Sequence, residues 1–368
     1  MAATGSPIVA VRVWEDVGVP LLERLSIGID IGGTAVKAGV VDPDGNVVER
    51  TLRETPSTSP TEVEDTIADV VSELRSRRDV VGVGIGAAGF VDITRSTVLF
   101  APHLAWRNEP LRDAVQRRIG LSVVVENDAN AAAWAEFRFG SAQREEDLVC
   151  ITLGTGIGGA MMFGGVLYRG RHGMAGEFGH MQVVPGGHSC ECGNRGCWEQ
   201  YASGNALVRE ARELAHKGSP MAQPMLDSIG VAPAKITGRL VSEAARGGDP
   251  AAQELLADVG NWLGVGIAGL AAALDTGLFV VGGGVSEAGE LLLGPARESY
   301  RRTLTGRGFR SEARIVKAHL GNDAGLVGAA DLARSRRSRS SARRASRSSR
   351  RSWGDGTAVA RLSQRWAE

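Results

Sequence analysis

From Ser26 onward, short apolar runs alternate with glycine-containing turns. Residues 26–30, 35–41 and 46–51 are rich in β-branched side chains, and the turns IGGT and DPDG separate them. Apolar runs of this length, bounded by turn signals, predict β-strands. The chain therefore begins its fold with three predicted strands, the first two joined by a glycine turn.

The polar and apolar positions that follow change to a helical period. Ser59, Pro60 and Glu62 fit an N-cap, a first-turn proline and a capping-box acid. The apolar residues after them fall on one helical face: Val63, Ile67, Val70, Val71 and Leu74. A buried strand is predicted next, at 80–88.

The strand and glycine-turn pattern recurs later in the chain. DLVCITL leads into the turn GTGIGG at 154–159, and AMMF and VLYRG follow as strands. A Rossmann-type dinucleotide site needs a helix after its glycine turn, whereas a second strand is predicted here. The pattern indicates a duplicated β-hairpin and disfavours dinucleotide binding. Beyond it we expect a long helix over 248–275, a strand at 278–283 and a final helix at 323–334.

Composition divides the chain into a folded body and two extensions. With 368 residues, 43% of them hydrophobic, the chain can build two cores with a cleft between them. Residues 334–368 hold 11 of the arginines, which leaves a net charge of −9 over 1–333 and argues against a nucleic-acid surface there. The Arg/Ser-rich tail is interpreted as a disordered extension, with nucleic-acid binding or phosphorylation as the alternative.

The four cysteines and the apolar runs bear on the compartment. Three cysteines cluster at metal spacing and the fourth, Cys150, lies in an apolar run, which indicates a reducing cytosol. No uninterrupted apolar run approaches the ~20 residues that span a bilayer, and residues 1–24 lack a signal-peptide pattern. We expect a cytoplasmic protein with no membrane partner.

The glycine turns are candidates for phosphate binding, because exposed backbone N–H groups without side chains let phosphate oxygens approach. Either turn alone is equally explained as a tight β-turn, and the duplication favours a nucleotide. A third glycine loop after the 278–283 strand can pass near an adenine ring. The predicted ATP site comprises Asp30 (toward Mg²⁺), Gly32, Gly33, Thr34, Gly154, Thr155, Gly156, Gly282 and Gly283.

Asp128 lies where a strand ending at Glu126 passes into an alanine-rich helix. An Asp at this position is ordinarily an N-cap of the helix. The functional alternative is a general base that accepts the proton of an attacking hydroxyl during phosphoryl transfer. An Asp of ordinary pKa would suffice for that role, because the proton leaves late.

The segment from His180 to Cys197 places one His and three Cys within eighteen residues, at the spacing of a zinc cage. With all four positions filled, by His180, Cys190, Cys192 and Cys197, the zinc is predicted to be structural rather than catalytic. Glu177 and Glu199 flank the cage and can accept hydrogen bonds from sugar hydroxyls. The second ring nitrogen of His180 carries an N–H that can donate a hydrogen bond to a further hydroxyl.

Taken together, DIGGT, ENDANAAAWAE, LGTGIGG, GEFGH, CECGNRGCWEQYASG and VVGGG resemble the ROK family of sugar kinases and repressors, most closely the ATP-dependent glucokinases. The resemblance covers about 26–334 and implies an α/β fold of the actin-like ATPase (ribonuclease H-like) type with duplicated domains. The predicted division is 1–24 as an extension, 25–132 as a small domain completed by 322–334, 133–321 as a large domain with the zinc loop, and 335–368 as the tail.

The resemblance also implies a reaction: glucose and Mg-ATP give glucose 6-phosphate, with Asp128 as the base. Sugar contacts would come from Gly89, His103, Asn127, Asp128, Glu177, His180 and Glu199, and the assembly would be a homodimer or homotetramer. His103 and Ala35 depart from the family pattern, which usually has Asn and Lys there. Fructose, mannose or an N-acetylhexosamine as acceptor, polyphosphate as donor, or a non-catalytic sugar-sensing regulator remain alternatives. No specific nucleic-acid partner is expected.

Overall fold

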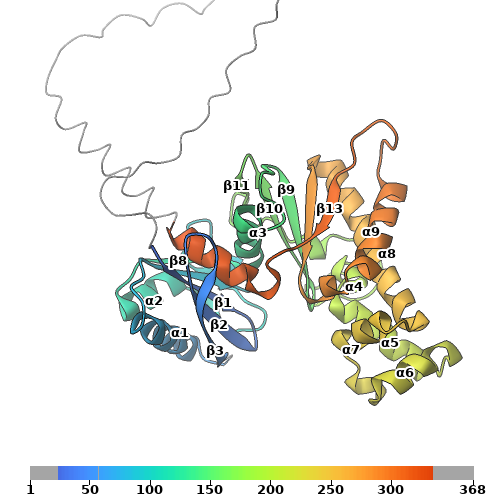
Figure 1. Ribbon diagram of the computed structural model, residues 1–368, viewed down its shortest axis with the longest axis horizontal. Helices are drawn as coiled ribbons and strands as arrows, with labels where there is room; N and C mark the ends of the chain where they lie inside the picture. The colour runs from blue at the N-terminus through green and yellow to red at the C-terminus, as the bar shows by residue number, and fades with distance from the viewer. Residues whose placement is uncertain (1–23, 57, 335–368) are drawn as a thin grey trace, which may run out of the picture.

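The computed structural model describes residues 24–56 and 58–334, so the predicted tail and all but the last residue of the N-terminal extension lie outside it. The first sheet contains β1 (Ser26–Ile31), β2 (Ala35–Val41), β3 (Val47–Glu54), β4 (Val83–Ala87) and β8 (Val123–Asn127), in the order β3-β2-β1-β4-β8. Strands β1 and β2 form the predicted antiparallel hairpin, while β1, β4 and β8 run parallel. The carboxyl ends of these parallel strands therefore meet at one edge (Figure 1).

Helices α1 (Pro60–Arg75) and α2 (Leu111–Ile119) and a small sheet accompany the first sheet. The small sheet consists of β5 (Phe90–Val91), β6 (Val98–Phe100) and β7 (Arg107–Glu109). The hydroxyl of Ser59 accepts the backbone N–H of Glu62, as the capping pattern predicts, and the predicted apolar face of α1 is buried. The residues of that face belong to the same hydrophobic cluster as those of the first sheet, so α1 packs against the sheet.

The second sheet repeats the hairpin of the first, which confirms the predicted duplication. It contains β9 (Leu148–Leu153), β10 (Ile157–Phe163), β11 (Val166–Leu167), β12 (Leu278–Gly282) and β13 (Arg314–Lys317), in the order β11-β10-β9-β12-β13. Strands β9 and β10 are antiparallel across the second glycine turn, and β12 is parallel to β9. In both sheets a glycine turn thus connects two strands, and the Rossmann arrangement is excluded for these turns.

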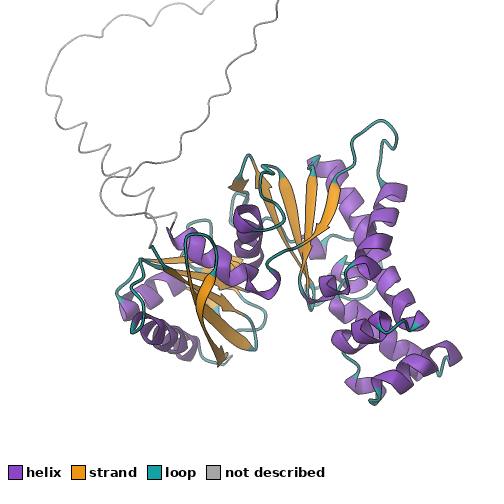
Figure 2. Ribbon diagram, in the orientation of Figure 1, coloured by secondary structure: helices purple, strands orange, loops and turns teal. Residues whose placement is uncertain are grey.

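Helices gather on one side of the second sheet (Figure 2). They are α4 (Glu199–Ala202), α5 (Gly204–His216), α6 (Gln223–Ile229), α7 (Gly238–Arg246), α8 (Pro250–Leu274) and α9 (Glu290–Thr303). Short 3₁₀ turns also occur in this half of the chain: η2 (Phe178–His180), η3 (Pro220–Ala222), η4 (Pro233–Lys235), η5 (Gly284–Ala288) and η6 (Gly321–Asp323). These helices and the sheet enclose the largest hydrophobic cluster of the described residues.

Helix α8 qualifies the expectation about membranes. By length and composition it is the one helix in the described ranges that could cross a bilayer. Most of it is buried inside the protein, between α7, α9 and the rest of the large cluster. A packed core helix passes the same length and composition test, and burial gives α8 that role here.

Two helices join the sheets: α3 (Asp128–Phe139) and the helical residues 324–334 (Figure 1). The helical backbone at Leu326 and Ala329 lies so close to the first sheet that a Cβ at Gly28 or Gly84 would overlap it. Buried Asp331 accepts a 2.8 Å hydrogen bond from Nε1 of Trp134 in α3. The end of the described chain is therefore fastened to its beginning.

Candidate functional site

Asp30, Asn127 and Asp128 lie at the same edge of the first sheet. In the strand register Asp30 is opposite Gly86, and Gly86 is opposite Glu126, so the ends of β1 and β8 flank β4. The N-cap of α3 is Asn127, whose side chain accepts the backbone N–H of Asn130 at 3.0 Å. The interpretation of Asp128 as the N-cap is therefore wrong, and its carboxylate is available for another role.

Asp128 is held by two hydrogen bonds to Oδ1, from Nδ2 of Asn127 at 3.0 Å and from the backbone N–H of Ala129 at 2.9 Å. Burial, followed by the negative charges of Asp30 and Glu177, raises the pKa of Asp128 to about 7. The role of general base requires no shift of this pKa, since an Asp of ordinary pKa would suffice, and the structure gives a raised one. A carboxyl that titrates near neutrality is better matched to proton transfer at physiological pH.

A buried ion pair lies directly behind this edge. Glu126 is 2% exposed, and its Oε2 accepts from Nε and Nη2 of Arg169 at 2.9 and 2.6 Å. Its Oε1 accepts from Nδ2 of Asn130 at 3.1 Å. Sequence reasoning missed Arg169. A buried strand-end acid signals that some cation must pair with it, but nothing in the sequence says which.

The first glycine turn brings Asp30 beside a lysine. Nζ of Lys37 lies 3.8 Å from Oδ2 of Asp30, across the β1–β2 hairpin. Burial raises the pKa of Asp30, and Lys37 partly offsets that rise. Gly33 lies against His103, where an added Cβ would be 2.8 Å from the Cβ of the histidine. The carboxylate of Asp30, the ammonium group of Lys37 and the side chain of His103 therefore all lie close to the first glycine turn.

The second glycine turn is supported from two sides. Gly154 accepts at its carbonyl the backbone N–H of Gly204 at 2.9 Å, and Thr155 accepts that of Asn205 at 3.3 Å, so the start of α5 rests on the turn. In the sheet register Gly282 is opposite Thr152 in β9, which brings the third glycine loop next to the second. Gly283 follows at once, and all the predicted phosphate residues of the later chain lie together.

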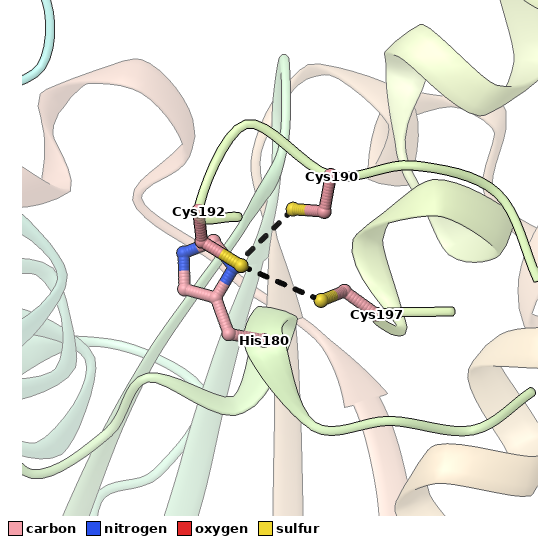
Figure 3. Close-up of side chains that lie close together, drawn as sticks. All are labelled: His180, Cys190, Cys192 and Cys197. Atoms are coloured by element: carbon pink, nitrogen blue, oxygen red, sulfur yellow. Dashed lines mark hydrogen bonds between the residues drawn. The ribbon is translucent and has the colours of Figure 1, made fainter. Parts of the chain in front are cut away.

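The four predicted metal ligands converge, as Figure 3 shows. One ligand atom from each of His180, Cys190, Cys192 and Cys197 lies within 4.8 Å of all the others. Sγ of Cys190 is 3.7 Å from Nδ1 of His180, and Sγ of Cys192 is 3.6 Å from Sγ of Cys197. Ligands at the corners of a zinc tetrahedron are separated by about 3.7 Å, given Zn–S bonds of ~2.3 Å. The donor set and its spacing therefore fit zinc.

The two flanking acids meet opposite edges of the His180 ring. Oε1 of Glu199 is 3.5 Å from Nδ1 and accepts from Sγ of Cys190 at 3.0 Å, while Oε2 of Glu177 is 3.9 Å from Nε2. Burial and the charge of Glu199 raise the pKa of Glu177, although His180 opposes the rise. The charge of Glu177 also raises the pKa of Asp128, so the acid beside the cage and the carboxyl at the sheet edge are electrostatically coupled.

Gly89, another of the predicted residues, lies at this edge beside Asn127. Gly89, with φ of 153°, accepts at its carbonyl the side-chain N–H of Asn127 at 3.1 Å. Thr34, Thr155 and His103 are exposed. A separate surface cavity of about 660 Å³ runs along α5 and contains none of the predicted site residues. The candidate site is therefore defined by converging side chains rather than by that cavity.

Comparison with known proteins gives the class. The model of the ROK family matches residues 26–336. The chain is 50% identical over 310 residues to a glucokinase of Streptomyces coelicolor, covering 84% of this chain and 98% of that relative. It belongs to the ROK family, which confirms the resemblance seen in its motifs and the α/β fold.

Two solved structures extend the comparison. A crystal structure of a ROK family glucokinase from Streptomyces griseus, in complex with glucose and AMPPNP, matches with a TM-score of 0.79 at 52% identity, covering 84% of this chain and 99% of that one. A ROK hexokinase from Thermus thermophilus matches with a TM-score of 0.69 at 34% identity, covering 84% and 97%. The whole described fold is thus shared with sugar-phosphorylating relatives.

Proposed function

We propose that this chain is a glucokinase, which transfers the γ-phosphoryl group of ATP to the 6-hydroxyl of glucose. The observation that carries the proposal is the position of Asp128, a carboxyl of pKa about 7 at the edge where the β1 and β8 ends meet. Family membership and the glucokinase relatives support the same reaction. ATP and glucose are the substrates.

Asp128 acts as the general base. Its Oδ1 is occupied by Asn127 and Ala129, so we assign Oδ2 to the 6-hydroxyl proton. The proton passes to the carboxylate as the oxygen bonds to phosphorus, and ADP leaves with the electrons of the broken bond. Asn127 orients the base, and its own orientation is fixed by its bonds to Gly89 and Asn130.

Glu177, His180 and Glu199 hold the other sugar hydroxyls. The two carboxylates accept hydrogen bonds, and Nε2 of His180 faces away from the cysteines, toward Glu177. Several polar groups aimed at one polyol give stringent selection, because an analogue lacking a hydroxyl leaves a buried group unpaired. Gly89 and His103 complete the proposed sugar contacts. The glucokinase relatives favour glucose over the other hexoses as the acceptor.

The two glycine turns and the loop at Gly282 and Gly283 hold the nucleotide. Backbone N–H groups and the hydroxyls of Thr34 and Thr155 would contact the phosphates, and Asp30 would hold Mg²⁺ directly or through water. A magnesium ion held there would supply positive charge for the transferring phosphoryl group. The pair of Asp30 with Lys37 keeps two opposite charges at this turn before nucleotide arrives.

The cage residues hold a structural zinc. His180, Cys190, Cys192 and Cys197 supply a full tetrahedral set, which leaves no open position for a water or substrate. His180 would bind this zinc through Nδ1, the nitrogen that lies 3.7 Å from Sγ of Cys190, which would leave Nε2 to contact the sugar. The cytoplasmic location and the homodimeric or homotetrameric assembly stay predictions of the sequence.

A coupled assay of ADP release over a panel of hexoses tests the proposal. With ATP and Mg²⁺ we expect glucose to be phosphorylated fastest, and mannose, fructose and N-acetylhexosamines more slowly. Product analysis should show the phosphate on the 6-hydroxyl. A purified chain that binds glucose and forms no glucose 6-phosphate would sink the proposal. Replacing ATP with polyphosphate in the same assay determines the donor.

A further inference from the structure

One glycine of the second turn lies against a sugar-side carboxylate. A Cβ built at Gly156 would overlap Oε2 of Glu199, and its next neighbour would be Cδ of the same side chain, at 3.4 Å. Gly156 belongs to the turn that we assign to phosphate, whereas Glu199 is assigned to sugar. The contact therefore joins the donor half of the site to the acceptor half.

Glu199 is anchored on the side of the cage. Its Oε1 lies 3.0 Å from Sγ of Cys190 and 3.5 Å from Nδ1 of His180. The preceding residue, Trp198, is fully buried, its backbone N–H donates to Met181 at 2.8 Å, and its Nε1 donates to Trp262 at 2.8 Å. With the backbone anchored and Oε1 beside the cage, the second oxygen of Glu199 lies in the space that a side chain at Gly156 would occupy.

The absence of a side chain at Gly156 is explained by this contact and not by the turn itself. Gly156 is not among the glycines with positive φ, so an alanine can adopt its backbone conformation. The neighbouring Gly154 makes the contrast, because a Cβ there would meet no heavy atom within 4 Å. Of the two turn glycines, only Gly156 has Glu199 against it.

The same relationship occurs in the first turn. Gly33 lies against His103, with 2.8 Å between the Cβ of His103 and the position of an added Cβ. In each of the duplicated turns, the absence of a side chain at one glycine thus leaves room for a residue of the proposed sugar set. The recurrence indicates that these turns serve the sugar as well as the phosphates.

We propose that Gly156 is a positioning residue for the sugar. Because Gly156 has no side chain, the carboxylate of Glu199 can occupy the position from which it binds a sugar hydroxyl, so a residue of the nucleotide turn sets the affinity for glucose. The proposal rests on the assignment of Glu199 to sugar in the proposed function. A methyl group at Gly156 displaces only the far end of a flexible side chain, so the fold is retained while Glu199 loses its hydroxyl partner.

Gly156→Ala tests this inference, with Gly154→Ala as the matched change in the same turn. We expect Gly156→Ala to weaken glucose binding, measured by calorimetry without nucleotide, by about 10- to 100-fold, as the loss of one hydrogen bond to a charged group predicts. The KM for ATP should change less than the KM for glucose. Gly154→Ala should show the reverse order, and circular dichroism and zinc content report whether either variant is folded.

A double-mutant cycle with Glu199→Asp makes the test specific. The shorter carboxylate removes the overlap, so Gly156→Ala should cost much less in the Asp background than in the wild type. Additive effects, or a rise in the KM for ATP alone, overturn the inference. The titrations are run over the hexose panel: activity on a hexose other than glucose overturns only the glucose assignment, and a wild-type chain that binds no hexose overturns both.

Discussion

Nδ2 of Asn127 donates a 3.0 Å hydrogen bond to Oδ1 of its neighbour Asp128. The same nitrogen donates to the carbonyl of Gly89 at 3.1 Å, and Oδ1 of Asn127 caps α3 through the backbone N–H of Asn130. One amide therefore caps the helix, orients the proposed base and connects both to the loop at Gly89. Asn127 caps the helix, and the carboxylate of Asp128 is therefore available as the proposed base. This explains why two adjacent polar residues are needed where one N-cap would be enough to begin the helix.

Asp128→Asn should abolish most turnover. Removing a general base costs about 10²- to 10⁴-fold in rate, and the isosteric amide keeps the size of the side chain. Because burial and like charges raise the pKa of Asp128, the neutral amide relieves a cost, and the melting temperature at pH 8 should stay equal or rise. We would measure kcat, glucose affinity and thermal unfolding together.

Asp69→Asn is the matched control, since Asp69 lies on the exposed face of α1, away from the site. It should leave kcat unchanged. A kcat of Asp128→Asn within tenfold of the wild type would remove Asp128 from the mechanism.

Activity should depend on pH through Asp128. The base must be ionised, and its pKa in the free protein is about 7, so kcat/KM for glucose should rise about tenfold per pH unit below 7 and level off above it. Asp30→Asn removes one of the charges that raise this pKa, so the residual activity of that variant should reach its plateau at lower pH. If kcat/KM for glucose stays constant between about pH 5 and pH 7 at fixed ionic strength, the assignment of Asp128 as the base is contradicted.

The raised pKa of Asp128 also affects stability. Activity should rise with pH, whereas the contribution of Asp128 to stability should fall. The folded pKa of Asp128 lies above its ordinary value of 3.8, so proton binding favours the folded state. The destabilising contribution of the charged carboxyl is present above pH 7 and diminishes as the pH falls toward 3.8. Asp128→Asn should remove this part of the pH dependence of unfolding, which denaturant titrations at several pH values would show.

Sequence patterns predicted the features that depend on local chemistry. The cap at Ser59 followed from side chains within one turn, and the hairpins followed from apolar runs on either side of glycine turns. The cage was predicted because its ligands are close in sequence and zinc constrains their spacing. In each case the residues that interact are also neighbours along the chain.

The features that sequence could not supply depend on packing between distant segments. Asn127 rather than Asp128 caps α3, because the backbone conformation decides which of two adjacent polar residues stands outside the helix. Arg169 reaches Glu126 across 43 positions of sequence. The pKa of Asp128 depends on Asp30 and Glu177, which three separate elements bring together. Spacing along the chain carries none of this information.

Zinc removal should destabilise the protein and weaken sugar binding. We expect one zinc per chain by elemental analysis, and its loss after Cys192→Ser, because one of four ligands is removed. Glucose affinity should fall with the metal, since His180 loses its fixed orientation. Cys150→Ala is the control: this cysteine is buried in β9, away from the cage, and zinc content should be unchanged. Full glucose affinity in metal-free protein would contradict the role given to His180.

His103→Asn should change the sugar preference. His103 is exposed beside Gly33 and belongs to the proposed sugar contacts, so the substitution alters the proposed sugar surface and leaves the core intact. We expect a several-fold change in the ratio of kcat/KM for glucose and mannose. His216→Asn, at the exposed end of α5, serves as the comparison. If both variants keep the wild-type ratio, His103 does not contact the sugar.

Glu136 holds the joint between the two sheets, and its replacement should loosen it. The carboxylate is 1% exposed and accepts three backbone N–H groups, from Ser141 at 2.8 Å, His319 at 3.0 Å and Leu320 at 2.7 Å. The last two lead directly into the helix 324–334 that fastens the second sheet to the first. A neutral amide must present a donor where one of these N–H groups needs an acceptor.

Glu136→Gln should therefore lower the free energy of unfolding by about 1–3 kcal/mol, the cost of a buried group left without its hydrogen bond. Glu145→Gln provides the comparison, because Glu145 lies in the loop after α3, where its contact with Arg314 joins exposed side chains. Exposed pairs of this kind contribute about 0–1 kcal/mol. Urea titration measures both variants, and hydrogen exchange at Leu320 reports the joint itself. Equal stabilities for the two variants would show that the joint is held by the apolar contacts of α3 and 324–334 alone.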